Sequence, residues 1–317
     1  MNIIISETEV ETLTKKQIAN FFGTKPEDLG PSFDSLYKTL DMTYRVVDGQ
    51  ERDNLILDIL NKIDNDKQKI GAPERTGVWF DGWDENLKDF RSSLTTDSIV
   101  PKFIRPDNII RLGGQFIEPS NKFFERDYAK LLQFFAYHKY ITEDIKNVYE
   151  FGCGSGFNLI NLSTTNKDLN LYGSDFVQSS VDLINEMGSH YDLNLTSKLF
   201  NMIEPDYEYE IKENSCVFTH GAIEQLAGNF KNFINFLVAK KPKICFHLEP
   251  TVEVYDKNSL FDHLQIKFHL KRGYTTGLLP YLRDLEKQGK IKDFYCKRVE
   301  FGSKFMEGYT LMSWRPK

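Results

Sequence analysis

From residue 147 to the end of the chain, short apolar runs alternate with segments of helical periodicity. This alternation predicts a parallel sheet with helices on both faces. Helical patterns, for example at 179–187 and 228–239, separate most of the strand-like runs. Two final runs, joined by a short turn, predict an antiparallel hairpin. We therefore expect a doubly wound, mostly parallel α/β sheet of seven strands. The predicted strands are 148–151, 171–175, 196–200, 215–219, 243–249, 293–301 and 308–314.

The first 140 residues have a different pattern. Apolar residues recur with helical spacing at 55–63, and 123–140 is densely apolar, so both segments predict helices. Residues 71–119 lie between them and carry turn signals such as Gly113-Gly114, which predict a loop-rich section. We expect two units. The first is a mainly helical region over residues 1–140, with loops that cover a substrate. The second is an α/β domain over 141–317, with an insertion at about 251–292.

Composition excludes several classes of protein. The chain has 317 residues and a net charge of −6, whereas a nucleic-acid-binding protein normally carries a basic patch. Residues 1–10 lack the basic and apolar regions of a signal peptide, and no apolar run approaches the roughly 20 residues of a membrane span. The four cysteines are far apart, as is typical of reduced thiols. We expect a cytoplasmic protein without a nucleic-acid or membrane partner, and the oligomeric state stays open.

Three glycines stand between a predicted strand and a predicted helix. Gly152, Gly154 and Gly156 follow the strand 148–151, and the helix begins at Phe157. Glycine permits a tight turn and lets a ligand approach the main chain. Asp175 ends the next predicted strand, 19 residues after the last glycine (175 − 156 = 19). A carboxylate at about this distance can accept hydrogen bonds from ribose hydroxyls. The alternative is that Asp175 caps the following helix, although a nearby serine is the better cap candidate.

The turn from Glu150 to Gly156 resembles the E/D-x-G-x-G-x-G motif of class I S-adenosylmethionine-dependent methyltransferases. It does not resemble the G-x-G-x-x-G motif of dinucleotide-binding proteins. The resemblance covers about residues 146–314, and it implies a Rossmann-like sheet with S-adenosyl-L-methionine as cofactor. The closing hairpin also favours a methyltransferase over a nicotinamide enzyme.

The resemblance implies a role for several residues of the cofactor site. The glycine turn would approach the methionine part of the cofactor, Asp175 would hold the ribose, and the segment after the third strand would contact the adenine. The implied cofactor residues are Glu150, Gly152, Gly154, Gly156, Asp175, Phe176, Asn201 and Met202. In the N-terminal region, residues 101–106 and 111–114 resemble segments of bacterial methyltransferases associated with surface-sugar or small-metabolite biosynthesis.

Two segments with polar side chains are expected at the carboxyl edge of the sheet, where acceptors bind in such folds. His220 follows one strand and Glu224 lies four residues later, so a helix starting there would put both on one face. An imidazole titrates near neutrality, at about 6.5, so His220 is a candidate base for a hydroxyl acceptor. The alternative is a histidine that only bonds the backbone or packs on the adenosine.

The second segment ends the strand 243–249. Strand alternation places His247 and Glu249 on one face, and Pro250 stops the strand. Because burying a polar pair is costly, we expect Glu249 to orient the acceptor and His247 to bind it. The alternative is that Glu249 is a buried partner of an arginine or lysine.

A third group lies in the predicted insertion. His269, Arg272 and Tyr274 are candidates for substrate binding, since the planar fork of an arginine grips a carboxylate or phosphate. The alternative is a solvated basic face. Trp79, from the section 71–119, is placed in the same site as part of an aromatic loop. No close-spaced set of metal ligands is present, so we expect no metal.

The leading hypothesis is transfer of a methyl group to a hydroxyl of a small polar metabolite or an activated sugar. Three alternatives remain at this point: N-methylation of an amino sugar, amine or amino-acid-like acceptor, methylation of a protein, and a nicotinamide enzyme or non-catalytic module with the same sheet. Specificity in this fold comes from the added segments, so the sequence does not name the acceptor.

Overall fold

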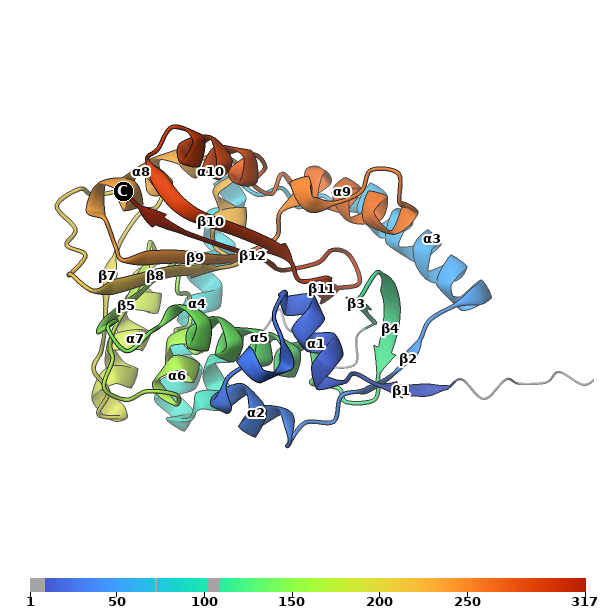
Figure 1. Ribbon diagram of the computed structural model, residues 1–317, viewed down its shortest axis with the longest axis horizontal. Coiled ribbons are helices and arrows are strands. Elements are labelled where there is room, and N and C mark those ends of the chain that lie inside the picture. Colours follow the sequence, from blue (N-terminus) through green and yellow to red (C-terminus); the bar gives the residue numbers. More distant parts are fainter. Residues whose placement is uncertain (1–8, 72, 102–108) are drawn as a thin grey trace, which may run out of the picture.

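The computed structural model describes residues 9–71, 73–101 and 109–317. Its centre is a seven-stranded sheet with the strand order β10-β12-β9-β8-β5-β6-β7 (Figure 1). Strands β5 to β9 are parallel, and β12 is antiparallel to both of its neighbours. The predicted α/β sheet with a closing hairpin is confirmed, and the five parallel strands lie within one residue of their predicted bounds. The strands are β5 (Asn147–Phe151), β6 (Asn170–Asp175), β7 (Leu195–Leu199), β8 (Ser215–His220), β9 (Ile244–Glu249), β10 (Ile291–Arg298) and β12 (Thr310–Pro316).

Helices cover both faces of this sheet. Val148 and Phe246 point to the face packed by α5 (Phe124–Tyr140), α6 (Phe157–Ser163) and α7 (Gln178–His190). Their neighbours Tyr149 and Cys245 point to the opposite face, which is packed by α8 (Lys231–Lys240) and α10 (Leu278–Lys287). Because successive strand residues alternate between two covered faces, β5 and β9 are buried along their whole length.

The N-terminal region is mainly helical, as predicted, but its longest helix was not predicted. Helix α4 (Pro73–Ser93) takes up 21 residues of the section expected to be loop-rich. Proline is favoured at the first position of a helix, so the proline turn signal marks where α4 begins. Gly77 and Gly82 lie inside the helix, where each costs about 1 kcal/mol relative to alanine and weakens the helical pattern. The other helices are α1 (Lys15–Phe22), α2 (Pro31–Tyr37) and α3 (Gly49–Asn65).

A second sheet was also not predicted. It is antiparallel, with the order β1-β2-β4-β3-β11. Four of its strands come from the N-terminal region, and β11 comes from the segment that joins β10 to β12 (Figure 1). The two expected units therefore share this sheet. Of the two N-terminal segments noted in the sequence, 111–114 contributes to β3, and residues 102–106 lie outside the described residues. The strands are β1 (Val10–Thr12), β2 (Thr43–Val46), β3 (Ile110–Leu112), β4 (Gln115–Pro119) and β11 (Phe301–Ser303).

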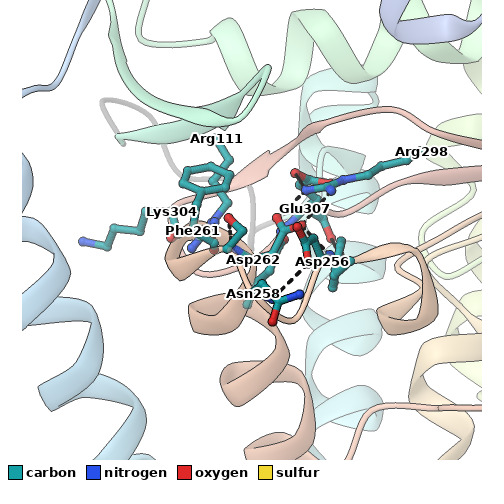
Figure 2. A network of polar contacts seen from close by, with 11 residues as sticks. Arg111, Asp256, Asn258, Phe261, Asp262, Arg298, Lys304 and Glu307 are labelled. Atoms are coloured by element: carbon teal, nitrogen blue, oxygen red, sulfur yellow. Dashed lines mark hydrogen bonds and ion pairs between the residues drawn. The ribbon is translucent and has the colours of Figure 1, made fainter.

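A buried polar network joins the small sheet to α9 (Leu260–Arg272) (Figure 2). Arg298 makes bidentate hydrogen bonds to Asp262 (2.6 and 2.8 Å) and to Glu307 (both 2.7 Å). Arg111 lies beside it, fully buried, and donates from Nη1 to the main-chain oxygen of Phe261 (2.8 Å). Its guanidinium stacks 4.1 Å from the ring of the same phenylalanine. The network therefore holds the predicted insertion against the N-terminal region.

Candidate active site

A cavity of about 1500 Å³ lies at the carboxyl ends of β5, β6, β7 and β8. Helices α3, α4 and α5, the start of α6, the end of α9 and residues between 302 and 309 supply most of the rest of its wall. Ligands bind at this edge in open α/β sheets, because the loops that follow parallel strands converge there. The cavity exceeds the roughly 300–1000 Å³ of a pocket for one small ligand, so it has room for two molecules.

The glycine turn requires glycine at all three positions, but for different reasons. Gly152, Gly154 and Gly156 have φ of +71°, +52° and +75°. The first two line the cavity, and α4 lies on the turn: a Cβ on Gly154 would be 2.6 Å from Cζ2 of Trp83. Gly156 does not line the cavity. A Cβ there would be 2.7 Å from Cγ1 of Ile184 in α7, so Gly156 permits helix packing, and its predicted cofactor contact is corrected to a packing role.

Asp175 ties the glycine turn to the end of β6. Its Oδ2 accepts from the Gly154 N–H (2.9 Å), and its Oδ1 accepts from the Val177 N–H (3.1 Å). The carboxylate lines the cavity, and burial raises its pKa to about 6. Helix α7 begins after Val177, and Ser179 lies inside the helix, so neither candidate side chain is its N-cap. Phe176 follows, with its ring edge against Phe80 of α4, and it also lines the cavity.

The loop after β7 provides the wall expected to contact an adenine. Asn201 and Met202 both line the cavity. Met202 is buried, whereas Asn201 is exposed and uses its Oδ1 to accept from the Ile203 N–H (2.9 Å). This bond leaves the amide N–H groups of Asn201 available to a ligand.

Glu150 does not reach the cavity, so its predicted direct contact with the cofactor is not present. It is fully buried in β5, and its Oε1 accepts from Nδ2 of Asn158 (2.6 Å). Its Oε2 has no partner among the described residues, and burial raises its pKa well above the usual value. Asn158 does line the cavity and bonds Gln133 of α5. Glu150 thus acts on the site through these two amides.

His220 and Glu224 both line the cavity, but they do not share a helical face. Gly221 lies between them with φ of +63°, so no single helix contains both residues. Glu224 lies in a short 3-10 helix, Ile223–Leu226. Burial lowers the pKa of His220 to about 4. Its ring meets that of Tyr309 edge to face, with centroids 5.1 Å apart. The predicted face is wrong, yet the two side chains lie in one site.

Glu249 and His247, predicted to orient and bind the acceptor, are buried and do not line the cavity. Glu249 accepts from the N–H groups of Ala222 (3.0 Å) and Glu224 (3.2 Å), so it holds the loop that carries His220. Thr219 links it to His247 by side-chain hydrogen bonds. The other ring nitrogen of His247 accepts from the Trp314 indole (2.9 Å). Among the described residues, Glu249 has backbone N–H groups and the Thr219 side chain as partners, and not the arginine or lysine of the alternative prediction.

Of the three substrate-binding candidates from the predicted insertion, two line the cavity and one does not. Arg272 and Tyr274 line the cavity, and the Arg272 Nε donates to Asp66 (2.8 Å). His269, also predicted to bind substrate, does not line the cavity: the residue is buried, and its Nε2 donates to the main-chain oxygen of Thr275 (2.9 Å). Trp79 lines the cavity from α4 and stacks on Trp83.

Sequence reasoning missed the face of α5 that lines the cavity. Glu125, Ala129 and Gln133 recur every four residues, which places them on one side of the helix. Glu125 makes no hydrogen bond or ion pair with any residue that the structure describes, and burial raises its pKa to about 7. The sequence signal for this face was the presence of two polar residues, Glu125 and Gln133, on one side of a densely apolar helix.

Within residues 9–71, 73–101 and 109–317, no three His, Cys, Asp or Glu side chains gather in a way that could hold a metal ion. No helix in this part of the chain is long and apolar enough to cross a membrane.

No protein-family model matches the sequence, and no curated protein matches it either. Solved structures do resemble it in fold. The [4+2]-cyclase SpnF is 11% identical, with a TM-score of 0.49 over 79% of this chain and 99% of its own. Human N-acetylserotonin methyltransferase is 11% identical, with a TM-score of 0.40 over 61% and 56%. An O-methyltransferase family 2 protein from Planctomyces limnophilus is 9% identical, with a TM-score of 0.39 over 54% and 51%.

The chain has a Rossmann-like α/β fold. Its seven-stranded, mostly parallel sheet and its antiparallel closing strands are those that the resemblance of the glycine turn implied. A fold of this kind does not by itself determine the reaction. The reaction has to be argued from the residues of the cavity.

Proposed function

We propose that this protein binds S-adenosyl-L-methionine on the glycine turn and methylates a small acceptor held in the same cavity. One observation carries the proposal: the main chain of Gly152 and Gly154 and the carboxylate of Asp175 line one wall of the cavity. The turn offers bare backbone, Asp175 offers acceptor oxygens to ribose hydroxyls, and Asn201 offers amide N–H groups at the adenine end. When bound, the cofactor supplies a methyl group on a sulfonium, which a nucleophile displaces.

The residues of the chain would then align the acceptor and exclude water. Helix α4 covers the turn, with Trp83 against Gly154 and Phe80 against Phe176. Helix α3 and the end of α9 form the far wall of the cavity, where Arg272 lies. Elements from both ends of the chain surround this space, which favours a small molecule over a polymer as the acceptor.

We further propose that the acceptor group is a hydroxyl of a polar metabolite or an activated sugar. A hydroxyl needs a group to take its proton, whereas a neutral amine does not. Glu125 and His220 both line the cavity, and Glu125 supplies a carboxylate that can take this proton. N-methylation of an amine-containing acceptor is the alternative, and it would not depend on either side chain.

Calorimetry with S-adenosylmethionine, S-adenosylhomocysteine and NAD tests the cofactor assignment. We expect both adenosyl compounds to bind and NAD not to bind, and the reverse result would overturn the proposal. Asp175→Asn should weaken S-adenosylhomocysteine about tenfold or more, because hydrogen bonds to a charged group contribute about 1.5–3 kcal/mol. Asp168→Asn, at an exposed position outside the cavity, is the matched control and should leave the affinity unchanged.

The acceptor itself can be sought by mass spectrometry. Small molecules that co-purify with the protein would be identified first, and then metabolites would be screened for the mass of one added CH₂. Binding of S-adenosylmethionine without any methylated product from hydroxyl compounds, but with product from amines, would replace the hydroxyl assignment by N-methylation.

A further inference from the structure

A chain of hydrogen bonds runs from the buried Glu150 to the cavity. Asn158 Nδ2 donates to Glu150 Oε1 (2.6 Å), and Asn158 Oδ1 accepts from Gln133 Nε2 (2.7 Å). Gln133 Nε2 also lies 3.2 Å from Nδ1 of His220. Gln133 Oε1 accepts from Asn161 Nδ2 (3.1 Å), so the orientation of the Gln133 amide is set on both of its sides. Because Asn161 donates to its oxygen, the Gln133 amide places its Nε2 donor at His220.

This order fixes the tautomer of His220. An amide nitrogen only donates, so Nδ1 of His220 accepts from Gln133 and carries no proton. Burial lowers the pKa of this imidazole to about 4, so it is neutral at pH 7 with its one proton on Nε2. Nε2 makes no hydrogen bond to any described residue, and the side chain lines the cavity. His220 therefore presents an N–H donor to the cavity and not the lone pair that a base requires.

Glu125 lies in the same part of the cavity. It is two helical turns before Gln133 on the same face of α5, and its carboxylate has no bonding partner among the described residues. Its charge acts on the hydroxyl of Tyr309, whose ring contacts that of His220. Glu125, Tyr309 and His220 thus surround one space, beside the glycine turn and open to the cavity.

The charged groups around Glu125 leave it available as a proton acceptor. Tyr309 and His220 are uncharged at pH 7, and Glu224 faces Tyr309 from the loop after β8. On α5 itself, Arg126 is paired with Asp127 (2.9 Å). No ion pair with a described residue lowers the pKa of Glu125, and burial raises that pKa to about 7.

We propose, on the basis of the methyltransferase function above, that Glu125 is the base for a hydroxyl acceptor and that His220 Nε2–H holds the acceptor oxygen. The acceptor O–H bond breaks, and its proton passes to a carboxylate oxygen of Glu125. The oxygen lone pair forms the bond to the methyl carbon as the carbon–sulfur bond breaks, and that electron pair leaves on the thioether sulfur. Gln133 and Asn158 are positioning residues, because they act through His220.

The tautomer can be measured on the free protein, without cofactor or acceptor. Long-range ¹H–¹⁵N spectra of protein labelled in histidine show which ring nitrogen bears the proton, and His220→Ala assigns the signal. We expect the Nε2–H form, and we expect Gln133→Ala to allow both forms. A pure Nδ1–H form in the wild-type protein would mean that the chain runs in the opposite direction, and the assigned role of His220 would be wrong.

The role of Glu125 has two readouts. In free protein carrying ¹³C-labelled glutamate, the signal removed by Glu125→Gln should titrate near pH 7. With an acceptor found by the metabolite screen, Glu125→Gln should lower kcat about 10²–10⁴-fold and abolish the rise in rate through pH 7, while S-adenosylhomocysteine binds within twofold of wild type. His220→Ala should lower the rate less, since it removes one hydrogen bond. Glu143→Gln, at an exposed position just after α5, is the control for charge and should behave as wild type.

These outcomes separate the two proposals. If wild-type protein fails to bind S-adenosylhomocysteine, the methyltransferase function fails, whatever the tautomer of His220. If the cofactor product binds and Glu125→Gln keeps full activity, the function stands and Glu125 is not the base. If His220→Ala causes the larger loss and Glu125→Gln the smaller, the two roles are reversed.

Discussion

Replacing Gly154 by alanine should destabilise the protein through two separate effects. The residue has φ of +52°, and a left-handed backbone costs an L-residue about 1–2 kcal/mol. The new Cβ would also lie 2.6 and 2.8 Å from two ring carbons of Trp83, closer than real Cβ contacts. Overpacking of this kind costs about 1–3 kcal/mol. We therefore expect the free energy of unfolding to fall by about 2–5 kcal/mol.

Two further variants separate the effects. Gly49 has φ of +49°, and a Cβ there would meet nothing within 4 Å, so Gly49→Ala carries the backbone cost alone, about 1–2 kcal/mol. Trp83→Ala removes the atoms that a Cβ at position 154 would strike. In the double variant Gly154→Ala/Trp83→Ala the overpacking is gone, so the two substitutions should be coupled by about 1–3 kcal/mol.

Urea unfolding followed by circular dichroism gives the free energies for all four variants. If Gly154→Ala is no more destabilising than Gly49→Ala, and no coupling to Trp83 is found, then α4 does not lie on the glycine turn, and one wall of the cavity is wrongly placed. Calorimetry on the double variant adds a second criterion. Its stability should recover relative to the sum of the single variants, but its affinity for S-adenosylhomocysteine should not, because Trp83 and Gly154 both line the proposed cofactor site.

Three other predictions concern charge and burial. Because burial raises the pKa of Asp175 from 3.8 to about 6, the folded state keeps this proton longer than the unfolded chain, so stability from this group is present below pH 4 and is lost as the pH rises through 6. The loss at pH 7 is about 3 kcal/mol, and the difference in unfolding free energy between wild type and Asp175→Asn should show that pH dependence. His247→Phe should destabilise by about 1–3 kcal/mol for each buried partner it leaves unbonded, Trp314 among them, and calorimetry should find S-adenosylhomocysteine binding unchanged because the ring is outside the cavity. Arg298→Met should lower the unfolding free energy by about 3–5 kcal/mol in urea, since two buried carboxylates lose their partner, and a smaller loss would mean that they take up protons instead.

The parallel strands could be predicted because burial on both faces leaves a strong signal in a short segment. Strand β8 reads Ser-Cys-Val-Phe-Thr-His and β9 reads Ile-Cys-Phe-His-Leu-Glu, and both are buried almost throughout. A strand or helix with one face in solvent would not have such a run, because its exposed side chains would be polar. Runs of this kind are typical of strands that are covered on both faces. The turns between them were marked by glycine and by polar residues, so the bounds were found to within one residue.

The small sheet and α4 could not be predicted, for opposite reasons. The strands of the small sheet have three to five residues, too few for a periodicity to be recognised, and β11 pairs with a strand from the other end of the chain. Helix α4 is long, but its two internal glycines and its initial proline resemble the composition of a loop. Its packing against α7, with Leu87 and Phe90 buried, overrides that local preference.

Strand alternation correctly grouped His247 with Glu249 but said nothing about what covers their face. Alternation tells which side chains share a face of the sheet. Which helix or loop covers that face depends on the tertiary structure. On β9 that face is packed beneath α8 and α10, so the two polar side chains bond internal partners. The polar pair was therefore correctly recognised as a costly burial. In the structure, these side chains stabilise the loop after β8, and they do not line the cavity.

The two halves of the cavity differ in how far apart their residues are along the chain. The half proposed for the cofactor is built from loops that directly follow β5, β6 and β7, so each contact is set by a few consecutive residues and by main-chain geometry. The half proposed for the acceptor gathers Glu125 from α5, His220 from β8 and Tyr309 from the segment before β12 in one cavity wall. Such contacts depend on side chains that only the complete fold brings together. A substitution in the second half changes the acceptor surface without disturbing the glycine turn, which is the physical reason why one fold can serve many acceptors.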